Sequence, residues 1–219
     1  MLATPNRSAF STLTSIFPYM LAMAAVVIAS NFLVQFPVHY DLGPFVLSDL
    51  LTWGAFTYPI AFLVTDLSNR HFGPARARLI VTVGFVLAVA ISIHVASPRI
   101  AIASGTAFIL AQFLDVSIFD RLRHSRWWHA PLISSALGSV LDTVLFFSLA
   151  FAASLSVLGA NDAFATGSAP LLGYFALEAP RWLSWALGDL AVKLLVSLAM
   201  LAPYRMLLAL FRTPAAADI

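Results

Sequence analysis

Residues 131–155 read PLISSALGSVLDTVLFFSLAFAASL and include a single charged side chain, that of Asp142. A helix needs about 20 consecutive apolar residues to cross a bilayer, so this stretch predicts a transmembrane helix. A carboxylate at the centre of such a helix costs about 2.5–3.5 kcal/mol on insertion scales. We therefore expect Asp142 to have a partner inside the membrane.

The composition of the whole chain indicates the same environment. Of 219 residues, 61% are hydrophobic and only 10% are charged, and the mean hydropathy is +0.91. Soluble domains contain about 25% charged residues, and disordered chains have low hydrophobicity, so both classes are excluded. We predict an all-α integral membrane protein with six transmembrane helices, at residues 16–36, 52–69, 78–96, 100–119, 131–155 and about 182–210.

Turn-forming residues separate these predicted helices. A connector with two Asp, two Pro and one Gly occupies residues 37–51, and a long polar connector occupies residues 159–178. Pro59 is expected to kink the second helix. A signal peptide is an alternative at the N-terminus, but the apolar run exceeds the usual ~7–15 residues. The expected division is an N-terminal surface segment (1–15), a six-helix transmembrane domain (16–212) and a C-terminal tail (213–219).

The basic residues indicate the orientation. Cytoplasmic loops of membrane proteins carry an excess of Lys and Arg. With six spans and both termini in the cytoplasm, only Arg99 and Arg181 fall on the outer side, and Lys193 lies within a span. The inner side receives Arg7, Arg70, Arg76, Arg78, Arg121, Arg123, Arg126, Arg205 and Arg212. This bias supports both the helix count and the orientation.

Polar side chains inside the predicted helices follow regular stripes. The sixth helix carries Trp185, Asp189, Lys193 and Ser197. Their spacing of four residues places them on one helix face, where Asp189 and Lys193 can neutralise each other. Lys193 is the only lysine of the chain, and it is the obvious partner for Asp142.

Four other predicted helices also contain polar stripes. The fifth contains Ser135, Gly138, Ser139 and Asp142, the fourth Gln112 and Asp115, the second Asp66, Asn69 and Arg70, and the first Asn31 and Gln35. Each has a structural explanation, because small residues pack helices together and amides bond across them. Asp189–Lys193 and Asp66–Arg70 can likewise be ion pairs that only stabilise the bundle. Together the stripes favour the lining of a polar cavity, since intramembrane ionisable groups mark substrate pathways.

The sequence disfavours several function classes. It contains no G-x-x-x-x-G-K-[ST] loop for a nucleotide-driven pump, and no histidine beside an intramembrane serine, as a hydrolase requires. It contains no cysteine, and His39 with Asp41 is too small a set for a metal site. A channel is hard to build from one compact chain, although an oligomer could form one. A small-solute carrier without a cofactor is favoured, and no enzyme activity is expected.

Many of the polar positions lie in motifs that resemble one transporter family. The matching stretches are residues 31–33, 58–69 (T-D-x-x-N), 72–78, 99–104, 112–119 (Q-x-x-D) and 139–147 (S-x-x-D-T-x-x-F-F). They resemble the queuosine precursor transporter family, also called the VUT family of vitamin-uptake transporters. The likeness covers most of residues 30–151 and continues more weakly through the sixth helix. Many members carry Asn-Glu where this chain has Asn69-Arg70.

The resemblance implies a six-helix importer in the cell inner membrane, similar in helix arrangement to the substrate-binding component of energy-coupling-factor transporters. The implied substrate is 7-cyano-7-deazaguanine or 7-aminomethyl-7-deazaguanine, used for queuosine synthesis in tRNA. A deazaguanine presents an N–H and an amine side by side, so one carboxylate, from Asp115 or Asp142, can accept both hydrogen bonds. Gln112 or Asn31 can meet the carbonyl group, and an aromatic ring can stack on the heterocycle.

The candidate substrate-binding residues are Asn31, Gln35, Tyr58, Asp66, Asn69, Gln112, Asp115, Ser139, Asp142, Trp185, Asp189 and Lys193. The expected partners are a small 7-deazapurine and the lipid bilayer, with no nucleic acid, and a homo-oligomer is compatible with the sequence. Two alternatives stay open. One is a vitamin-binding component that works only with an energising ATPase complex, and the other is a scaffold without transport activity.

Overall fold

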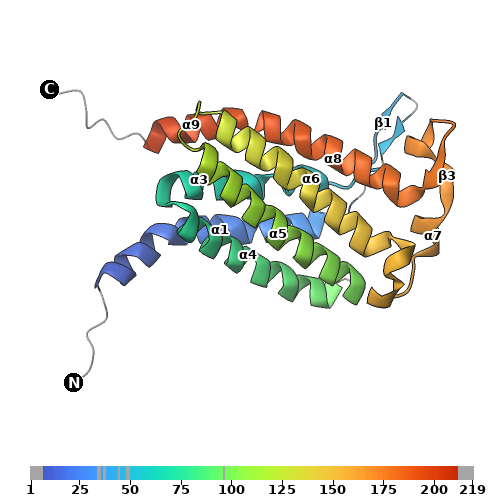
Figure 1. Cartoon of the computed structure of the whole chain (residues 1–219), viewed down its shortest axis with the longest axis horizontal. Helices are drawn as coiled ribbons and strands as arrows, with labels where there is room; N and C mark the ends of the chain where they lie inside the picture. The colour runs from blue at the N-terminus through green and yellow to red at the C-terminus, as the bar shows by residue number, and fades with distance from the viewer. Residues whose placement is uncertain are drawn as a thin grey trace, which may run out of the picture.

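A computed structural model describes residues 7–33, 36, 38–43, 45–47, 50–95 and 97–211 of the chain. Its long helices run along the longest axis of the molecule (Figure 1): α1 Arg7–Leu33, α3 Ile60–Phe72, α4 Pro74–Val95, α5 Pro98–Leu122, α6 His129–Phe151, α8 Arg181–Ala199 and α9 Leu201–Phe211. Short helical elements join them: α2 Gly54–Thr57, η2 Ala153–Leu158, α7 Ala163–Thr166 and η3 Leu171–Gly173.

Several of these helices are suited to a bilayer. Four segments of the described chain are long and apolar enough to cross a membrane: Pro74–Ile91, Pro98–Leu122, His129–Phe151 and Arg181–Ala209. A shorter apolar segment, Thr14–Ser30, lies within α1. The predicted class, an all-α membrane protein, is therefore confirmed, whereas the count of six spans stays a prediction.

Two of the predicted spans are interrupted at prolines. Proline lacks a backbone N–H, and its ring clashes with the carbonyl group four residues earlier. In the second span, α2 and α3 are separate helices and α3 begins directly after Pro59, where a kink was predicted. In the sixth span, α8 ends at Ala199, four residues before Pro203, and the chain continues as α9. The break between α8 and α9 was not predicted.

The two connectors contain regular structure that the sequence analysis missed. Residues 37–51 include an antiparallel hairpin of β1 Asp41–Leu42 and β2 Phe45–Val46. After α7, β3 Ser168–Pro170 pairs with β4 Glu178–Pro180 in a second antiparallel hairpin. Strands of two or three residues are too short to show the alternation that reveals a strand. Both hairpins lie at the same end of the bundle (Figure 1), which we call the hairpin end.

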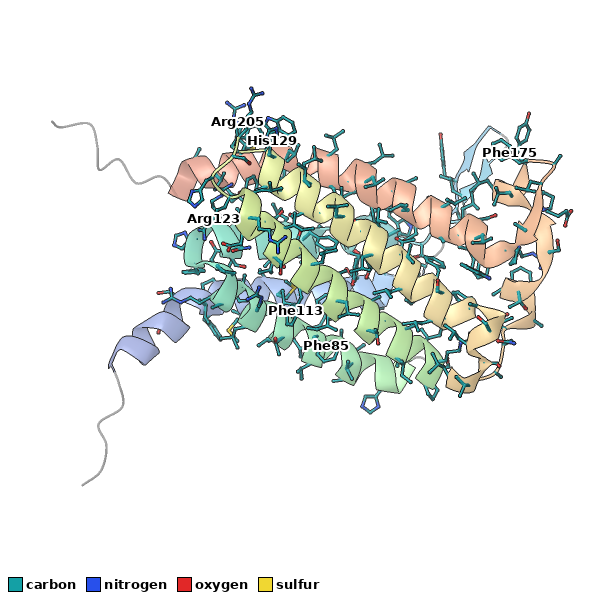
Figure 2. All side chains as sticks on the ribbon, in the orientation of Figure 1. Phe85, Phe113, Arg123, His129, Phe175 and Arg205 are labelled. Atoms are coloured by element: carbon teal, nitrogen blue, oxygen red, sulfur yellow. The ribbon has the colours of Figure 1, made fainter. Side chains whose placement is uncertain are left out.

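Basic side chains gather at the opposite end. Figure 2 shows Arg123, His129 and Arg205 close to this end, whereas Phe175 lies at the hairpin end. The turn between α3 and α4 and helix α9 also lie here (Figure 1). We call this end the basic end. The grouping agrees with the predicted segregation of charge, which assigned these arginines to one side of the membrane.

Arg99, assigned from the sequence to the outer side of the membrane, packs inside the protein, which was not predicted. Its side chain is buried, with only 4% of the residue exposed. It donates hydrogen bonds to the carbonyl oxygens of Leu149 (2.9 Å) and Ala152 (2.7 Å) and to Asn161 Oδ1 (2.9 Å). The last carbonyl groups of a helix have no partner within it, so Arg99 on α5 ties down the end of α6.

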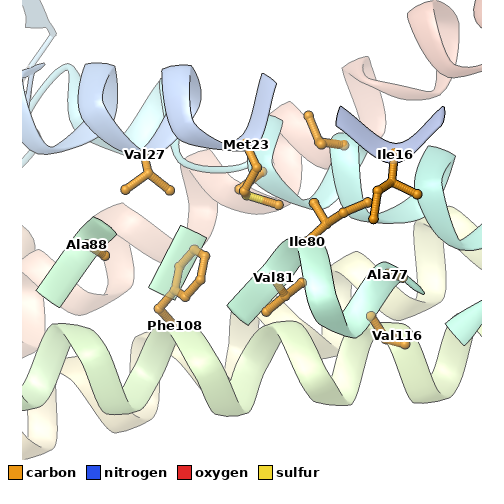
Figure 3. Packing of buried hydrophobic residues seen from close by; sticks show 11 residues of the cluster. Ile16, Met23, Val27, Ala77, Ile80, Val81, Ala88, Phe108 and Val116 are labelled. Atoms are coloured by element: carbon orange, nitrogen blue, oxygen red, sulfur yellow. The ribbon is translucent and has the colours of Figure 1, made fainter. Parts of the chain in front are cut away.

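Close helix contacts align the polar stripes. The main apolar cluster joins α1, α4 and α5, with Met23, Val81 and Phe108 among its buried residues (Figure 3). On the other side of α5, a Cβ added to Gly138 of α6 would lie 2.8 Å from Phe62 Cε1. Gly138 thus serves as a packing residue, and it lets α3, α5 and α6 meet where their polar side chains lie.

Candidate functional site

Lys193 is the centre of a buried ionic network between α6 and α8. Its Nζ lies 2.7 Å from Asp142 Oδ2 on α6 and 2.5 Å from Asp189 Oδ2 on α8. Tyr58 Oη donates to Asp142 Oδ1 (3.2 Å), and Thr143 Oγ1 donates to Asp189 Oδ2 (3.0 Å). We call these five residues the lysine network. It supplies the intramembrane partner that Asp142 was expected to have.

The charges within the lysine network do not balance. Two carboxylates face one ammonium group, so the ionised network carries one excess negative charge. Both oxygens of Asp142 accept hydrogen bonds. Asp189 uses only Oδ2, so its Oδ1 has no donor among the residues that the structure describes. Asp189 is also the most open of the three charged side chains, 16% exposed against 5% for Lys193 and Asp142.

Local sequence explains why the lysine network forms. Asp189 and Lys193 are one helical turn apart on α8, which brings their side chains together. Gly188 faces the connector, where an added Cβ would lie 3.4 Å from the carbonyl oxygen of Leu50. The connector therefore lies directly against α8 beside the network. The ring of Tyr58 completes the enclosure, 5.2 Å from Lys193 Nζ.

Aromatic rings surround the next turn of α8 toward the hairpin end. Trp185 lies four residues before Asp189. Its ring centroid is 5.6 Å from that of Phe151 and 6.2 Å from that of Phe164. The three residues come from α8, α6 and α7. They provide flat apolar surface next to the open carboxylate of Asp189.

A second polar contact joins α3 to α5. Thr65 Oγ1 donates to Gln112 Oε1 over 2.6 Å, and both residues are fully buried. Among the described residues no acceptor meets Gln112 Nε2, and Ser139 Oγ on α6 also has no partner. A buried polar group without a hydrogen bond costs about 1–3 kcal/mol. We call Thr65 and Gln112 the glutamine pair.

Two acids face each other nearer the basic end. Asp66 on α3 is 2% exposed and Asp115 on α5 is 0% exposed. Ser134 and Ser135 of α6 each donate to one oxygen of Asp66 over 3.3 Å. Asp115 lies beside the same carboxyl and hydroxyl groups. However, neither of its oxygens accepts a hydrogen bond of normal geometry from the described residues. We call Asp66 and Asp115 the acid pair.

The alternative Asp66–Arg70 ion pair is wrong. Arg70 Nε instead donates to Tyr204 Oη over 3.1 Å, and its Nη1 donates to the carbonyl oxygen of Arg123. The guanidinium group also lies 5.0 Å from the ring centroid of Phe119. The turn of α3 directs Arg70 toward α9 and the basic end, away from the acids.

The structure thus brings most of the predicted residues to the facing sides of α3, α5, α6 and α8. Asn69 is also buried there, where its Nδ2 donates to the carbonyl oxygen of Val116 over 2.9 Å. The side chain of Asn31 and the whole of Gln35 lie outside the described residues. Thr65, Ser134 and Thr143 were not among the candidate residues, although Thr65 and Thr143 lie in the motifs T-D-x-x-N and S-x-x-D-T-x-x-F-F. Each of the three directly adjoins, in the chain, a polar residue of a predicted stripe.

Sequence comparisons relate the chain to known transporters. The chain matches the family described as "Putative vitamin uptake transporter" over residues 52–96 and 91–207. The "Queuosine precursor transporter" of Escherichia coli (strain K12) is 37% identical over 199 residues, which cover 81% of this chain and 79% of that protein. The "Probable queuosine precursor transporter" of Haemophilus influenzae (strain ATCC 51907 / DSM 11121 / KW20 / Rd) is 37% identical over 153 residues, 58% of this chain and 65% of that protein.

No solved structure matches the chain. The family match spans most of the chain, from α2 to α9, and includes the lysine network, the glutamine pair and the acid pair. The members are transporters, which agrees with the predicted carrier and with the expectation that the chain is not an enzyme. On this evidence the chain belongs to the vitamin-uptake, or VUT, family of membrane transporters.

Proposed function

We propose that the chain imports a 7-deazaguanine precursor of queuosine, with a cyano or an aminomethyl group at C7, across the cell inner membrane. The names of its relatives support this substrate class. In the proposed topology six spans cross the membrane and the basic end faces the cytoplasm. The gathering of Arg123, His129 and Arg205 at that end supports this orientation.

The observation that carries the proposal is the lysine network. A deazaguanine edge has an N–H and an exocyclic amine next to a carbonyl oxygen, so it needs an acceptor pair beside a donor. A carboxylate can accept from both N–H groups, as acidic side chains do with base donors. Asp189, with its free Oδ1, can provide this carboxylate. Lys193 has three N–H donors, two of which already reach carboxylates, so the third can meet the carbonyl oxygen.

The aromatic side chains beside Asp189 suit the flat part of such a ligand. Stacking of a base on an aromatic ring contributes about 1–3 kcal/mol. Trp185 lies one turn from Asp189 and is held by Phe151 and Phe164. In this proposal the heterocycle stacks on Trp185 while its polar edge reaches Asp189. Of the two carboxylates proposed from the sequence, Asp115 and Asp142, the second is less suitable, because Tyr58 and Lys193 already occupy its oxygens.

The test uses cells that cannot synthesise 7-deazaguanines and therefore depend on uptake. Asp189→Asn keeps the shape of the side chain but replaces one acceptor oxygen with a donor. We expect it to lower uptake of labelled 7-cyano-7-deazaguanine at least about fivefold, because a good bidentate contact contributes about 1–3 kcal/mol. The matched control is Asp120→Asn, which changes an acid at the basic end that pairs with Arg123. Equal uptake by wild type and Asp189→Asn, at equal abundance in the membrane, would contradict the assignment.

The second candidate, kept open by the sequence resemblance, is a binding component of an ATP-driven complex, which would use the same site. Reconstitution of the purified chain alone separates the two functions. Uptake by liposomes that contain only this chain supports the carrier. Uptake that appears only after an ATPase complex and ATP are added supports the binding component.

A further inference from the structure

The acid pair has more hydrogen-bond acceptors than donors around it. Asp66 and Asp115 together present four carboxyl oxygens, and the donors that reach them are the hydroxyl groups of Ser134 and Ser135. Both hydroxyl groups bond to Asp66, and Asp115 is left without a donor among the described residues. Asn69 Oδ1, one turn along α3, is a further buried oxygen without a partner. This excess of acceptors indicates a missing cation.

Two ionised carboxylates do not persist side by side in a buried place, because each disfavours the charge of the other. A single proton removes the conflict. It converts one acid into a hydroxyl donor, and that donor bonds to the carboxylate of its neighbour. The oxygens of Asp115 then have the partner that they lack. A proton needs only the two acids as partners, whereas a sodium ion would need a full shell of oxygen ligands, and the liposome test below distinguishes the two cations.

The hydrogen bonds of the charged groups nearest the acid pair go to other residues. Arg70 Nε donates to Tyr204 and its Nη1 to the carbonyl oxygen of Arg123, and its buried Nη2 has no partner among the described residues. Arg123 bonds to Asp120 and to the last carbonyl groups of α3. The remaining titratable or charged side chains described on α1, α3, α4, α5, α6 and α9 are Tyr19, His71, Arg76, Arg78, His94, Arg99, Arg121, His129, Asp142 and Arg205. His71 apart, none of these groups has a hydrogen bond or an ion pair to either acid among the described residues.

The acid pair is also linked to the lysine network. Thr65 precedes Asp66 on α3, and Gln112 lies one turn from Asp115 on α5. The glutamine pair therefore joins the same two helices as the acid pair. Tyr58, two residues before the start of α3, bonds to Asp142 in the lysine network. A shift of α3 that follows substrate binding at the lysine network would therefore move Asp66 relative to Asp115.

We propose that Asp66 and Asp115 share one proton, and that this proton enters the cell together with the substrate. The coupling rests on the proposed function, whereas the shared proton does not. One proton and one substrate molecule cross in the same cycle, and no covalent bond in the substrate forms or breaks. Substrate accumulation is then driven by a difference in pH across the membrane.

The shared proton is tested without substrate. Infrared spectra of the purified full chain should contain the carbonyl band of a protonated carboxylic acid, with a shift upon exchange into D2O. We expect Asp115→Asn and Asp66→Asn each to abolish this band, because an amide can donate to the remaining carboxylate. Asp120→Asn should keep it. If the band is absent from wild type, or unchanged in both acid-pair variants, the shared proton is wrong.

The coupling is tested in liposomes that contain the full chain and labelled 7-cyano-7-deazaguanine. With the interior more alkaline than the medium, wild type and Asp120→Asn should accumulate the substrate. If one proton enters with each neutral substrate molecule, the ratio of the inside to the outside substrate concentration can reach about tenfold per unit of pH difference. A protonophore should abolish the accumulation, and Asp115→Asn should reach equal concentrations on both sides. Asp66→Asn is the second variant if Asp115→Asn does not fold.

Three outcomes would overturn the coupling. One is substrate accumulation of the same size with and without a pH difference. Another is substrate accumulation driven by a sodium gradient alone. The third is a pH dependence of Asp115→Asn and Asp66→Asn equal to that of wild type. A chain that shows the infrared band but no uptake of 7-deazaguanines under any gradient would contradict the proposed function and its coupling, and would leave the shared proton intact.

Discussion

Lys193 of α8 lies 2.7 Å from Asp142 of α6, although the two residues are 51 positions apart in the chain. The contact is buried, with both side chains 5% exposed. It is the first of two ion pairs on the same ammonium group, since Asp189 lies 2.5 Å from it. Two helices are thus joined by opposite charges inside an apolar bundle. Removal of one partner from such a buried set leaves an uncompensated charge.

Lys193→Met is therefore expected to destabilise the fold. The variant leaves Asp142 and Asp189 buried without a cation, which costs about 3–5 kcal/mol when a buried pair is broken. Thermal unfolding of the purified protein in detergent measures the loss. The double variant Lys193→Met with Asp142→Asn should regain part of the stability, because it removes one of the two unpaired charges. A single variant as stable as wild type would contradict this view of the network.

Arg99→Ala should weaken the hairpin end of the bundle. It removes the donors for the carbonyl oxygens of Leu149 and Ala152. Each buried acceptor left without a donor costs about 1–3 kcal/mol. The same unfolding measurement applies, with Arg126→Ala, an exposed arginine of the α5–α6 turn, as the control. If both variants unfold at the same temperature, Arg99 does not hold the end of α6.

Gly138→Ala tests the close contact between α3 and α6. The new methyl group would lie 2.8 Å from Phe62 Cε1, and overpacking of a buried site costs about 1–3 kcal/mol. Alanine has a higher helix propensity than glycine, which by itself should stabilise the variant. A loss of stability would therefore come from the clash with Phe62. Phe62→Leu in the Gly138→Ala background should restore stability in part. A Gly138→Ala protein more stable than wild type would show that the helices separate easily here.

Trp185→Ala should weaken substrate binding without a large change in folding. Loss of one stacking partner costs about 1–3 kcal/mol, which corresponds to a roughly 5- to 150-fold higher Kd. Trp185→Phe should retain most of the affinity, since it preserves an aromatic face. The control is Trp127→Ala, because Trp127 lies at the basic end beside Arg205. Binding of 7-cyano-7-deazaguanine to purified protein supplies the values, and equal Kd values for Trp185→Ala and wild type would exclude stacking there.

Much of the architecture follows from local patterns in the sequence. Long apolar runs predict the membrane helices, and Pro59 predicts the break in the second span. The pairing of Lys193 with Asp142 is predictable because the chain contains one lysine and an isolated acid at comparable depth. Asp189 and Lys193 meet because they are one turn apart on a single helix. These features can be predicted because they depend only on residue spacing within one helix, or on the small number of charged residues in the apolar helices.

Contacts that depend on how separate helices rotate against each other could not be predicted. Asp66 meets Asp115 instead of Arg70 because the close approach of Phe62 to Gly138 fixes the orientation of α3. The contacts of Arg99 are also long-range, since its partners lie at the end of α6 and just beyond it. The short hairpins in the connectors leave no periodic signal.

The most direct test of the central claim compares two ligands on two proteins. Binding of 7-cyano-7-deazaguanine and of its analogue without the 2-amino group is measured by calorimetry for wild type and Asp189→Asn. If Asp189 accepts from that amine, loss of the amine should raise the Kd of wild type by at least about fivefold and hardly change that of Asp189→Asn. A wild-type protein that binds neither ligand, or that loses no more affinity than Asp189→Asn, would contradict the account.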